Sequence, residues 1–199
     1  MALFAFATLV LAHYAVAGNG AQVPVRLGTG LLWLAILLAS LLGLARLFAA
    51  ERDEGLLDAL LLAPVDRGAI WLSKVIGLTV LLGVLELVLV PLHWLFFFAD
   101  AHEPTPALVP MVLALVLADV GVAVVGSLVA ALASAARQRE VLLPLLFLPV
   151  ATPLLLLGTD VMIASAEGSS WVRQLGSIAL YDTFLGVLAW GAYEHVITE

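Results

Sequence analysis

Residues 107–133 read ALVPMVLALVLADVGVAVVGSLVAALA, and Asp119 is the only ionisable side chain in this stretch. A helix needs about 20 predominantly apolar residues to cross the hydrocarbon layer of a bilayer. Within lipid, an isolated segment must satisfy its backbone hydrogen bonds internally, and a helix does so. Residues 107–133 are therefore predicted to form a transmembrane helix.

Comparable apolar stretches recur along the chain, separated by short charged turns or turns that contain Pro or Gly. They cover residues 2–17, 28–48, 75–99, 141–158 and 175–197. These stretches leave no segment long enough for a soluble domain. We expect an all-α, polytopic membrane protein of about six transmembrane helices, with residues 1–199 forming a single transmembrane permease domain.

The composition favours the same class. Hydrophobic residues make up 64% of the chain and charged residues 12%, whereas soluble domains are close to half apolar and about a quarter charged. The absence of cysteine excludes a disulfide framework, a thiolate metal site and a thiol nucleophile. The net charge of -7 arises from 15 acidic and 8 basic residues. So few Lys and Arg give no electrostatic footprint for nucleic acid, so we expect no nucleic-acid partner.

The basic residues predict the orientation, because Lys and Arg near helix ends are retained on the cytoplasmic side. Six lie on one side of the predicted spans, at Arg46, Arg52, Arg67, Lys74, Arg137 and Arg139. Arg26 and Arg173 lie on the other side. Both termini and the loops at 49–73 and 134–140 are therefore expected in the cytoplasm. Residues 15–17, Ala-Val-Ala, imitate a signal-peptide cleavage site, but the positively charged start of a signal peptide is missing, so we expect the first helix to be retained.

The longest hydrophilic stretch on the cytoplasmic side is FAAERDEGLLDALLLAP, residues 48–64. Its apolar positions recur at helical spacing and its acids Glu54 and Asp58 lie four residues apart on another face, which predicts a short amphipathic helix ending near Pro64. Helices that lie on a membrane surface favour Lys and Arg on their polar face, whereas this helix carries acids. We therefore expect it to dock in a groove of a protein partner.

The pattern Phe-x-x-Glu-x-Asp-Glu-Gly-x-Leu-Asp-x-Leu from Phe48, followed by Ala63-Pro64 and Lys74, resembles the cytoplasmic loop of the heme exporter protein B (CcmB) family of ABC-type permeases. The resemblance extends to residues 28–33, to the six-span layout and to the acidic end at 194–199. Two features depart from the family. Asp58 stands where the family usually has Glu, and the chain opens inside the first span, whereas members usually begin with an amphipathic segment.

The resemblance implies a role in cytochrome c maturation at the inner membrane of a bacterium. The implied partners are a cytoplasmic ABC ATPase, a heme-handling membrane subunit, a small single-span subunit and a possible second permease copy. ATP hydrolysis on the partner would free a heme-loaded chaperone or move heme, and we expect this chain to bind no cofactor or metal itself. By analogy with ABC permeases, the coupling helix and ATPase-docking residues would be Glu51, Asp53, Glu54, Gly55, Leu57, Asp58, Leu60, Leu61 and Pro64.

The chain contains no Gly-x-x-x-x-Gly-Lys-Ser/Thr phosphate loop, so nucleotide chemistry must come from another chain. We expect a transporter subunit and not an enzyme, since an intramembrane enzyme would need a nucleophile and a base on facing helices. The remaining alternative is a stand-alone proton-coupled carrier that uses intramembrane carboxylates. Such carriers usually show a repeat between their halves, and we see none.

Three acids fall inside the predicted spans: Glu86, Asp119 and Asp182. An acid at the bilayer centre costs about 3 kcal/mol unless it is paired, protonated or facing water. We expect these carboxyls to be mostly neutral or to line a hydrated cavity, because desolvation penalises the charged form. Glu86 and Asp119 fit a polar path or a protonated acid bonded to a neighbouring helix equally well. For Asp182 the second interpretation is favoured, since Tyr181 and Thr183 form a polar band near one interface.

His93 and His102 lie near the outer end of the third span beside Trp94 and three phenylalanines at 96–98. An axial heme ligand is conceivable in such a setting. Histidines beside aromatic residues near an interface more often belong to the interfacial belt, and the family resemblance places heme binding on another subunit. We therefore expect belt residues here.

Overall fold

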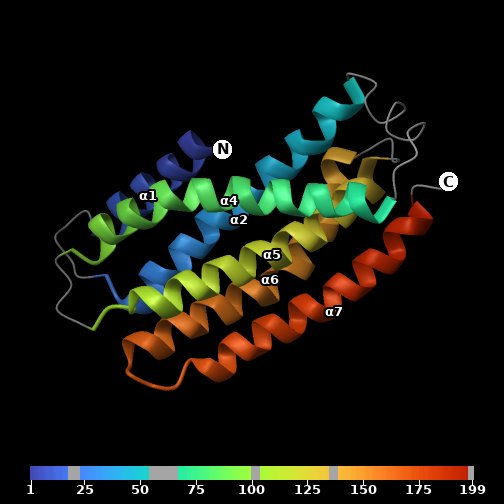
Figure 1. Ribbon diagram of the computed structural model, residues 1–199. Helices are drawn as coiled ribbons and strands as arrows, with labels where there is room; N and C mark the ends of the chain where they lie inside the picture. Colours follow the sequence, from blue (N-terminus) through green and yellow to red (C-terminus); the bar gives the residue numbers. More distant parts are fainter. Residues whose placement is uncertain (18–22, 54–66, 100–103, 135–138, 197–199) are drawn as a thin grey trace.

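The computed structural model describes residues 1–17, 23–53, 67–99, 104–134 and 139–196, and these residues are almost entirely helical. The helices are α1 (Ala2–Ala17), α2 (Val25–Asp53), α4 (Arg67–Phe97), α5 (Leu108–Ser134), α6 (Arg139–Ala166) and α7 (Val172–Val196). From α2 onward, consecutive helices run in opposite directions along one bundle (Figure 1). The ends Asp53, Ser134 and Val196 and the starts Arg67 and Arg139 therefore lie toward the same end of the bundle.

The span in α5 is the most buried of the apolar spans, and α5 packs against α2, α4, α6 and α7. Its inward positions are small, with Ala114, Ala118 and Ala123 almost fully buried. Small residues allow the backbones of membrane helices to approach closely, and this replaces the hydrophobic driving force that lipid does not supply. Helix α1 packs at the side, against α2 and α4.

Three glycines mark the closest approaches between helices. A Cβ atom at Gly121 of α5 would meet the Asp182 carboxyl of α7, and one at Gly126 of α5 would lie 2.6 Å from a methyl group of Leu44 on α2. A Cβ atom at Gly158 of α6 would meet the ring of Trp33 on α2. Each glycine thus accepts a side chain of a neighbouring helix where any larger residue would collide with it.

The outer surface of the bundle is apolar. Leu87 on α4 and Leu180 on α7 are 76% and 73% exposed, and Trp190 of α7 is also exposed. Five helices, α2 and α4 to α7, are long and apolar enough to cross a membrane, and α1 is a shorter apolar helix of 16 residues. These observations confirm the expected all-α, multi-pass membrane fold.

The helix ends differ from those expected where charged residues adjoin the apolar stretches. Helix α2 continues to Asp53 instead of ending at residue 48, α4 begins at Arg67 instead of 75, and α6 continues to Ala166 instead of 158. The length of an apolar stretch reflects the thickness of the hydrocarbon layer, whereas the helix itself can continue beyond that layer into the interface. The sequence pattern therefore predicted where the spans are but underestimated the lengths of the helices.

Candidate functional site

The proposed docking segment begins on a helix. Glu51 and Asp53 belong to the last turn of α2, so the start of the acidic cluster is part of a helix that also crosses the membrane. In Figure 1 this end of α2 extends beyond the neighbouring helices. The other residues assigned to ATPase docking lie outside the described residues: Glu54, Gly55, Leu57, Asp58, Leu60, Leu61 and Pro64.

Glu86 and Asp119 come together between α4 and α5. Their carboxyl groups are close enough to interact electrostatically, and the two residues are only 8% and 3% exposed. The Oε1 atom of Glu86 is buried and has no hydrogen-bond partner among the described residues. The two acids singled out from the sequence as the most central are therefore direct neighbours on facing helices.

Asp182 occupies a separate position on α7. Its carboxyl group packs on Gly121 of α5, and both carboxyl oxygens are buried without a hydrogen-bond partner among the described residues. The adjacent Tyr181 donates a hydrogen bond from its hydroxyl to the carbonyl oxygen of Val150 on α6, at 3.0 Å. This polar band thus links α7 to both α5 and α6.

His93 is 1% exposed and joins α4 to α2. Its Nε2 lies 2.7 Å from the carbonyl oxygen of Gly28, to which it donates as the protonated nitrogen. The imidazole stacks on Phe97 and meets Phe98 edge-on, with ring centroids 5.0 and 5.1 Å away. A fully buried histidine is not an interfacial belt residue, and the bond to Gly28 occupies one of the two imidazole nitrogens that could bind a heme iron. His102 lies outside the described residues.

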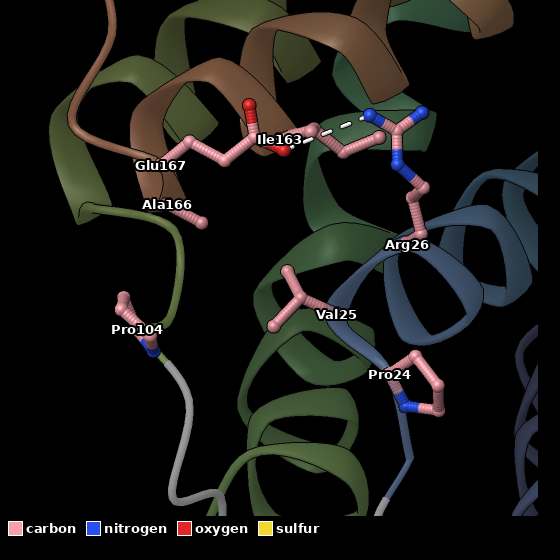
Figure 2. Close-up of a pocket in the computed structure, with 7 residues that line it drawn as sticks. All are labelled: Pro24, Val25, Arg26, Pro104, Ile163, Ala166 and Glu167. Carbon is pink, nitrogen blue, oxygen red and sulfur yellow. Dashed lines mark ion pairs between the residues drawn. The ribbon is translucent and has the colours of Figure 1, made fainter.

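A small pocket lies at the end of the bundle opposite Asp53, where α2 begins and α6 ends. Figure 2 shows its lining, which is mostly apolar: Pro24, Val25, Pro104, Ile163 and Ala166. Its cavity volume is about 240 Å³. At its rim Arg26 pairs with Glu167 at 3.6 Å, and both side chains are well exposed. An exposed pair of this kind contributes little to stability.

Comparison with known proteins tests the family resemblance. The family described as "CcmB protein" matches residues 1–193, which include nearly all of the helical bundle. The chain belongs to the CcmB family. Because the match runs from α1 into α7, it extends the resemblance far beyond the loop pattern at residues 48–74 that first indicated it.

Two CcmB relatives are similar over two thirds or more of their length. The heme exporter protein B of Rhodobacter capsulatus is 34% identical over 151 residues, which make up 76% of this chain and 67% of the relative. That of Pseudomonas aeruginosa is 30% identical over 191 residues, or 92% of this chain and 84% of the relative. The Escherichia coli K12 protein is 38% identical over a shorter stretch of 72 residues.

One further acid of this CcmB family member lies within a span and was not predicted there from the sequence. Asp160 lies on α6 within the span Val141–Ala166, and its side chain is exposed on the bundle surface. The expected helix ended at residue 158, so Asp160 lay outside the expected span. The apolar residues that follow it, Val161 to Ile163, were the signal that the helix continues.

Proposed function

We propose that this chain is the permease subunit of an ABC transporter complex that handles heme for cytochrome c maturation. The observation that carries the proposal is membership of the CcmB family together with a bundle of membrane-spanning helices. The relatives at 34% and 30% identity are named heme exporter protein B. Heme is the cargo of the complex, and ATP hydrolysis by a separate subunit would drive its movement or the release of a heme-loaded chaperone.

The proposed contact with the ATPase is the segment from Glu51 to Pro64. It begins in the last turn of α2 and precedes α4, so a force on it would act on two adjacent spans at once. An amphipathic helix with an acidic polar face suits a groove that receives apolar anchors and carries a basic rim. The heme-handling and single-span subunits, and a possible second permease copy, would pack on the membrane-embedded surface.

The proposed location is the bacterial inner membrane, with both termini in the cytoplasm. Basic residues are retained on the cytoplasmic side, and Arg67 and Arg139 open α4 and α6 at the same end of the bundle. Arg26 and Arg173 lie at the start of α2 and α7, at the opposite end. Since the chain has no cysteine, single-cysteine variants and a membrane-impermeant thiol reagent can test this directly. Cysteine at Ser170 should react in intact spheroplasts, and cysteine at Leu57 only after the membrane is opened.

The docking assignment predicts that Leu57→Asp with Leu60→Asp releases the ATPase. Two charges placed on the apolar face of the docking helix would be buried without partners in the groove. The measurement is the amount of ATPase that co-purifies with the tagged permease in detergent. We expect a loss of more than tenfold, with unchanged amounts of permease in the membrane.

The matched control is Ser170→Asp, which adds a charge in an exposed position at the opposite end of the bundle. It should leave the ATPase bound. Wild-type recovery of the ATPase with the double variant would exclude residues 51–64 as the docking site. If the single-cysteine labelling also placed Leu57 outside the cell, the permease role itself would have to be abandoned.

A further inference from the structure

Asp160 differs from the other acids of the spans in the direction that it faces. Glu86, Asp119 and Asp182 are at most 8% exposed and lie inside the bundle. Asp160 lies within the span Val141–Ala166 of α6 and is exposed on the outer surface. Its carboxyl group has no hydrogen bond or ion pair with the described part of the chain. The described helices therefore do not compensate the charge of this acid.

The depth of Asp160 follows from its place on α6. The span has 26 residues and ends at Ala166, so it is about 39 Å long, while the hydrocarbon layer is about 30 Å thick. Asp160 lies about 9 Å before the end of the span at about 1.5 Å per residue, which places it inside this layer. The Cα–Cβ bonds of a helix tilt toward its N-terminus, which at Asp160 is toward the middle of the membrane. The carboxyl group is thus directed away from the nearer interface.

The positions around Asp160 form one exposed face of α6. Leu145, Pro149, Thr152 and Leu156 are exposed as well, and all four lie within about 80° of Asp160 around the helix. We call these five residues the outer face of α6. Helix α6 packs against α2, α5 and α7 through its other sides. The outer face is therefore left uncovered by the described part of the bundle.

Two prolines add hydrogen-bond acceptors to the same side of α6. Pro149 and Pro153 have no N–H, so the carbonyl groups of Leu145 and Pro149 lack the usual donor four positions later. In transmembrane helices such carbonyls are satisfied by neighbouring helices, by Ser or Thr side chains or by water. Thr152 of the outer face donates instead to the carbonyl oxygen of Leu148, at 2.6 Å. The prolines and Asp160 thus indicate independently that this face needs hydrogen-bond donors.

We propose that the outer face of α6 binds a transmembrane helix of a partner membrane subunit, and that this helix places a Lys or Arg against Asp160. Lipid tails supply no hydrogen-bond donor, whereas Lys and Arg donate only and neutralise a carboxylate. Acids within spans typically pair with such residues. The inference rests on the proposed function, in which this chain works with other membrane subunits, and adds the face and the chemistry of their contact.

A second copy of this chain suits the outer face less well. Two identical membrane proteins in one orientation are related by a two-fold axis along the membrane normal, and a contact through the same face brings Asp160 toward Asp160 at equal depth. Like charges repel strongly where the dielectric constant is low. The basic side chain is therefore expected from a different chain.

Photocrosslinking in the native membrane tests the occupant of the outer face. A benzophenone amino acid replaces Leu156, one helical turn from Asp160, in the full-length chain expressed together with the other subunits. We expect an adduct whose partner peptide, identified by mass spectrometry, belongs to a membrane-spanning segment with a Lys or Arg. The matched control is the same replacement of Leu180 on α7, which is 73% exposed and should not form this adduct. Adducts with lipid only, with a second copy of the chain, or with a segment without Lys and Arg would overturn the proposal.

The charge of Asp160 is tested with two variants that keep the photocrosslinker at position 156. Asp160→Lys repels the partner's basic side chain, and Asp160→Leu leaves that side chain without an acceptor. Each should lower the adduct yield at least about tenfold, because an unpaired charge in a low-dielectric contact is strongly unfavourable. Replacing the identified Lys or Arg of the partner by Asp should restore the yield with Asp160→Lys. Unchanged yields in both variants, or no restoration by the exchange of charges, would overturn the pairing.

Two further measurements separate this contact from folding and from the proposed function. Asp160→Leu removes a charge from a lipid-facing position, so the isolated chain in detergent should be as stable as the wild-type chain or more stable. A loss of stability would show that Asp160 serves the bundle itself and would overturn the proposal. The ATPase that co-purifies is measured from the same membranes. Bound ATPase without an adduct at position 156 would overturn this contact alone, whereas an adduct without bound ATPase would support the contact and contradict the docking assignment.

Discussion

Gly158 provides the most direct test of how the bundle is packed. Trp33 of α2 is 2% exposed, and its ring lies on the backbone of α6 at this glycine. A Cβ atom at Gly158 would contact the nearest ring carbon and would lie 2.7 and 2.8 Å from two others. Carbon atoms that are not bonded to each other prefer separations of about 3.5–4.0 Å. Gly158→Ala must therefore displace the indole ring or the helix by about 1 Å.

Overpacking of this kind costs about 1–3 kcal/mol, while replacing Gly by Ala inside a helix returns roughly 0.5–1 kcal/mol. The difference between these two terms is about 0–2.5 kcal/mol. Because the new Cβ atom would lie far inside van der Waals separation, we expect the upper part of this range, a net loss of about 1–2 kcal/mol, which is roughly a 5–30-fold change in the folded-to-unfolded ratio. The free energy of unfolding can be measured by denaturant titration of the purified chain in detergent micelles, followed by circular dichroism.

The matched control is Gly186→Ala on α7, because a Cβ atom there meets nothing within 4 Å. This variant should be as stable as the wild-type chain or slightly more stable. In a Trp33→Leu background, Gly158→Ala should cost less than in the wild-type chain, since the smaller side chain makes room for the new methyl group. Equal stability of Gly158→Ala and Gly186→Ala would refute the close contact between α2 and α6.

Three further substitutions test individual contacts with the same unfolding measurement. His93→Leu removes the 2.7 Å bond to the Gly28 carbonyl and leaves that oxygen buried, so we expect a loss of about 1–3 kcal/mol; stability equal to wild type would exclude a structural role for His93. Tyr181→Phe removes the 3.0 Å bond to the Val150 carbonyl, and we expect a smaller loss of about 0.6 kcal/mol, typical of bonds between membrane helices. A loss of several kcal/mol would mean that the hydroxyl has additional partners. Arg26→Gln breaks an exposed ion pair and should change the free energy of unfolding by less than about 1 kcal/mol; a larger loss would show that the pair is shielded from water.

The spans could be predicted from the sequence because a helix that crosses lipid needs about 20 predominantly apolar residues in a row. Residues 107–133 contain a single ionisable side chain, and the helix observed there is Leu108–Ser134. The helix ends were harder to predict, since Asp160 and Glu51 interrupt the apolar composition without interrupting the helix. The end of an apolar stretch indicates where the hydrocarbon layer ends, but the helix can continue beyond that point.

The pairing of side chains could not be predicted, because it depends on how the helices rotate about their axes. Glu86 and Asp119 were recognised as central from their positions, but their contact requires two particular faces of α4 and α5 to meet. His93 was assigned to the interfacial belt because aromatic residues surround it in the sequence. Its actual partner, the Gly28 carbonyl, is 65 residues away, and no local pattern indicates it.

Helix α2 runs from Val25 to Asp53 without a proline, whereas α6 contains three, at 144, 149 and 153. An unbroken helix bends little, so α2 acts as a stiff rod about 38 Å long between Asp53 and Gly28, at about 1.5 Å per residue. If a partner displaced the Asp53 end of α2, the continuous helix would pass that displacement toward Gly28 at the opposite end of the bundle. At that opposite end, the hydrogen bond from His93 to the Gly28 carbonyl holds α2 against α4.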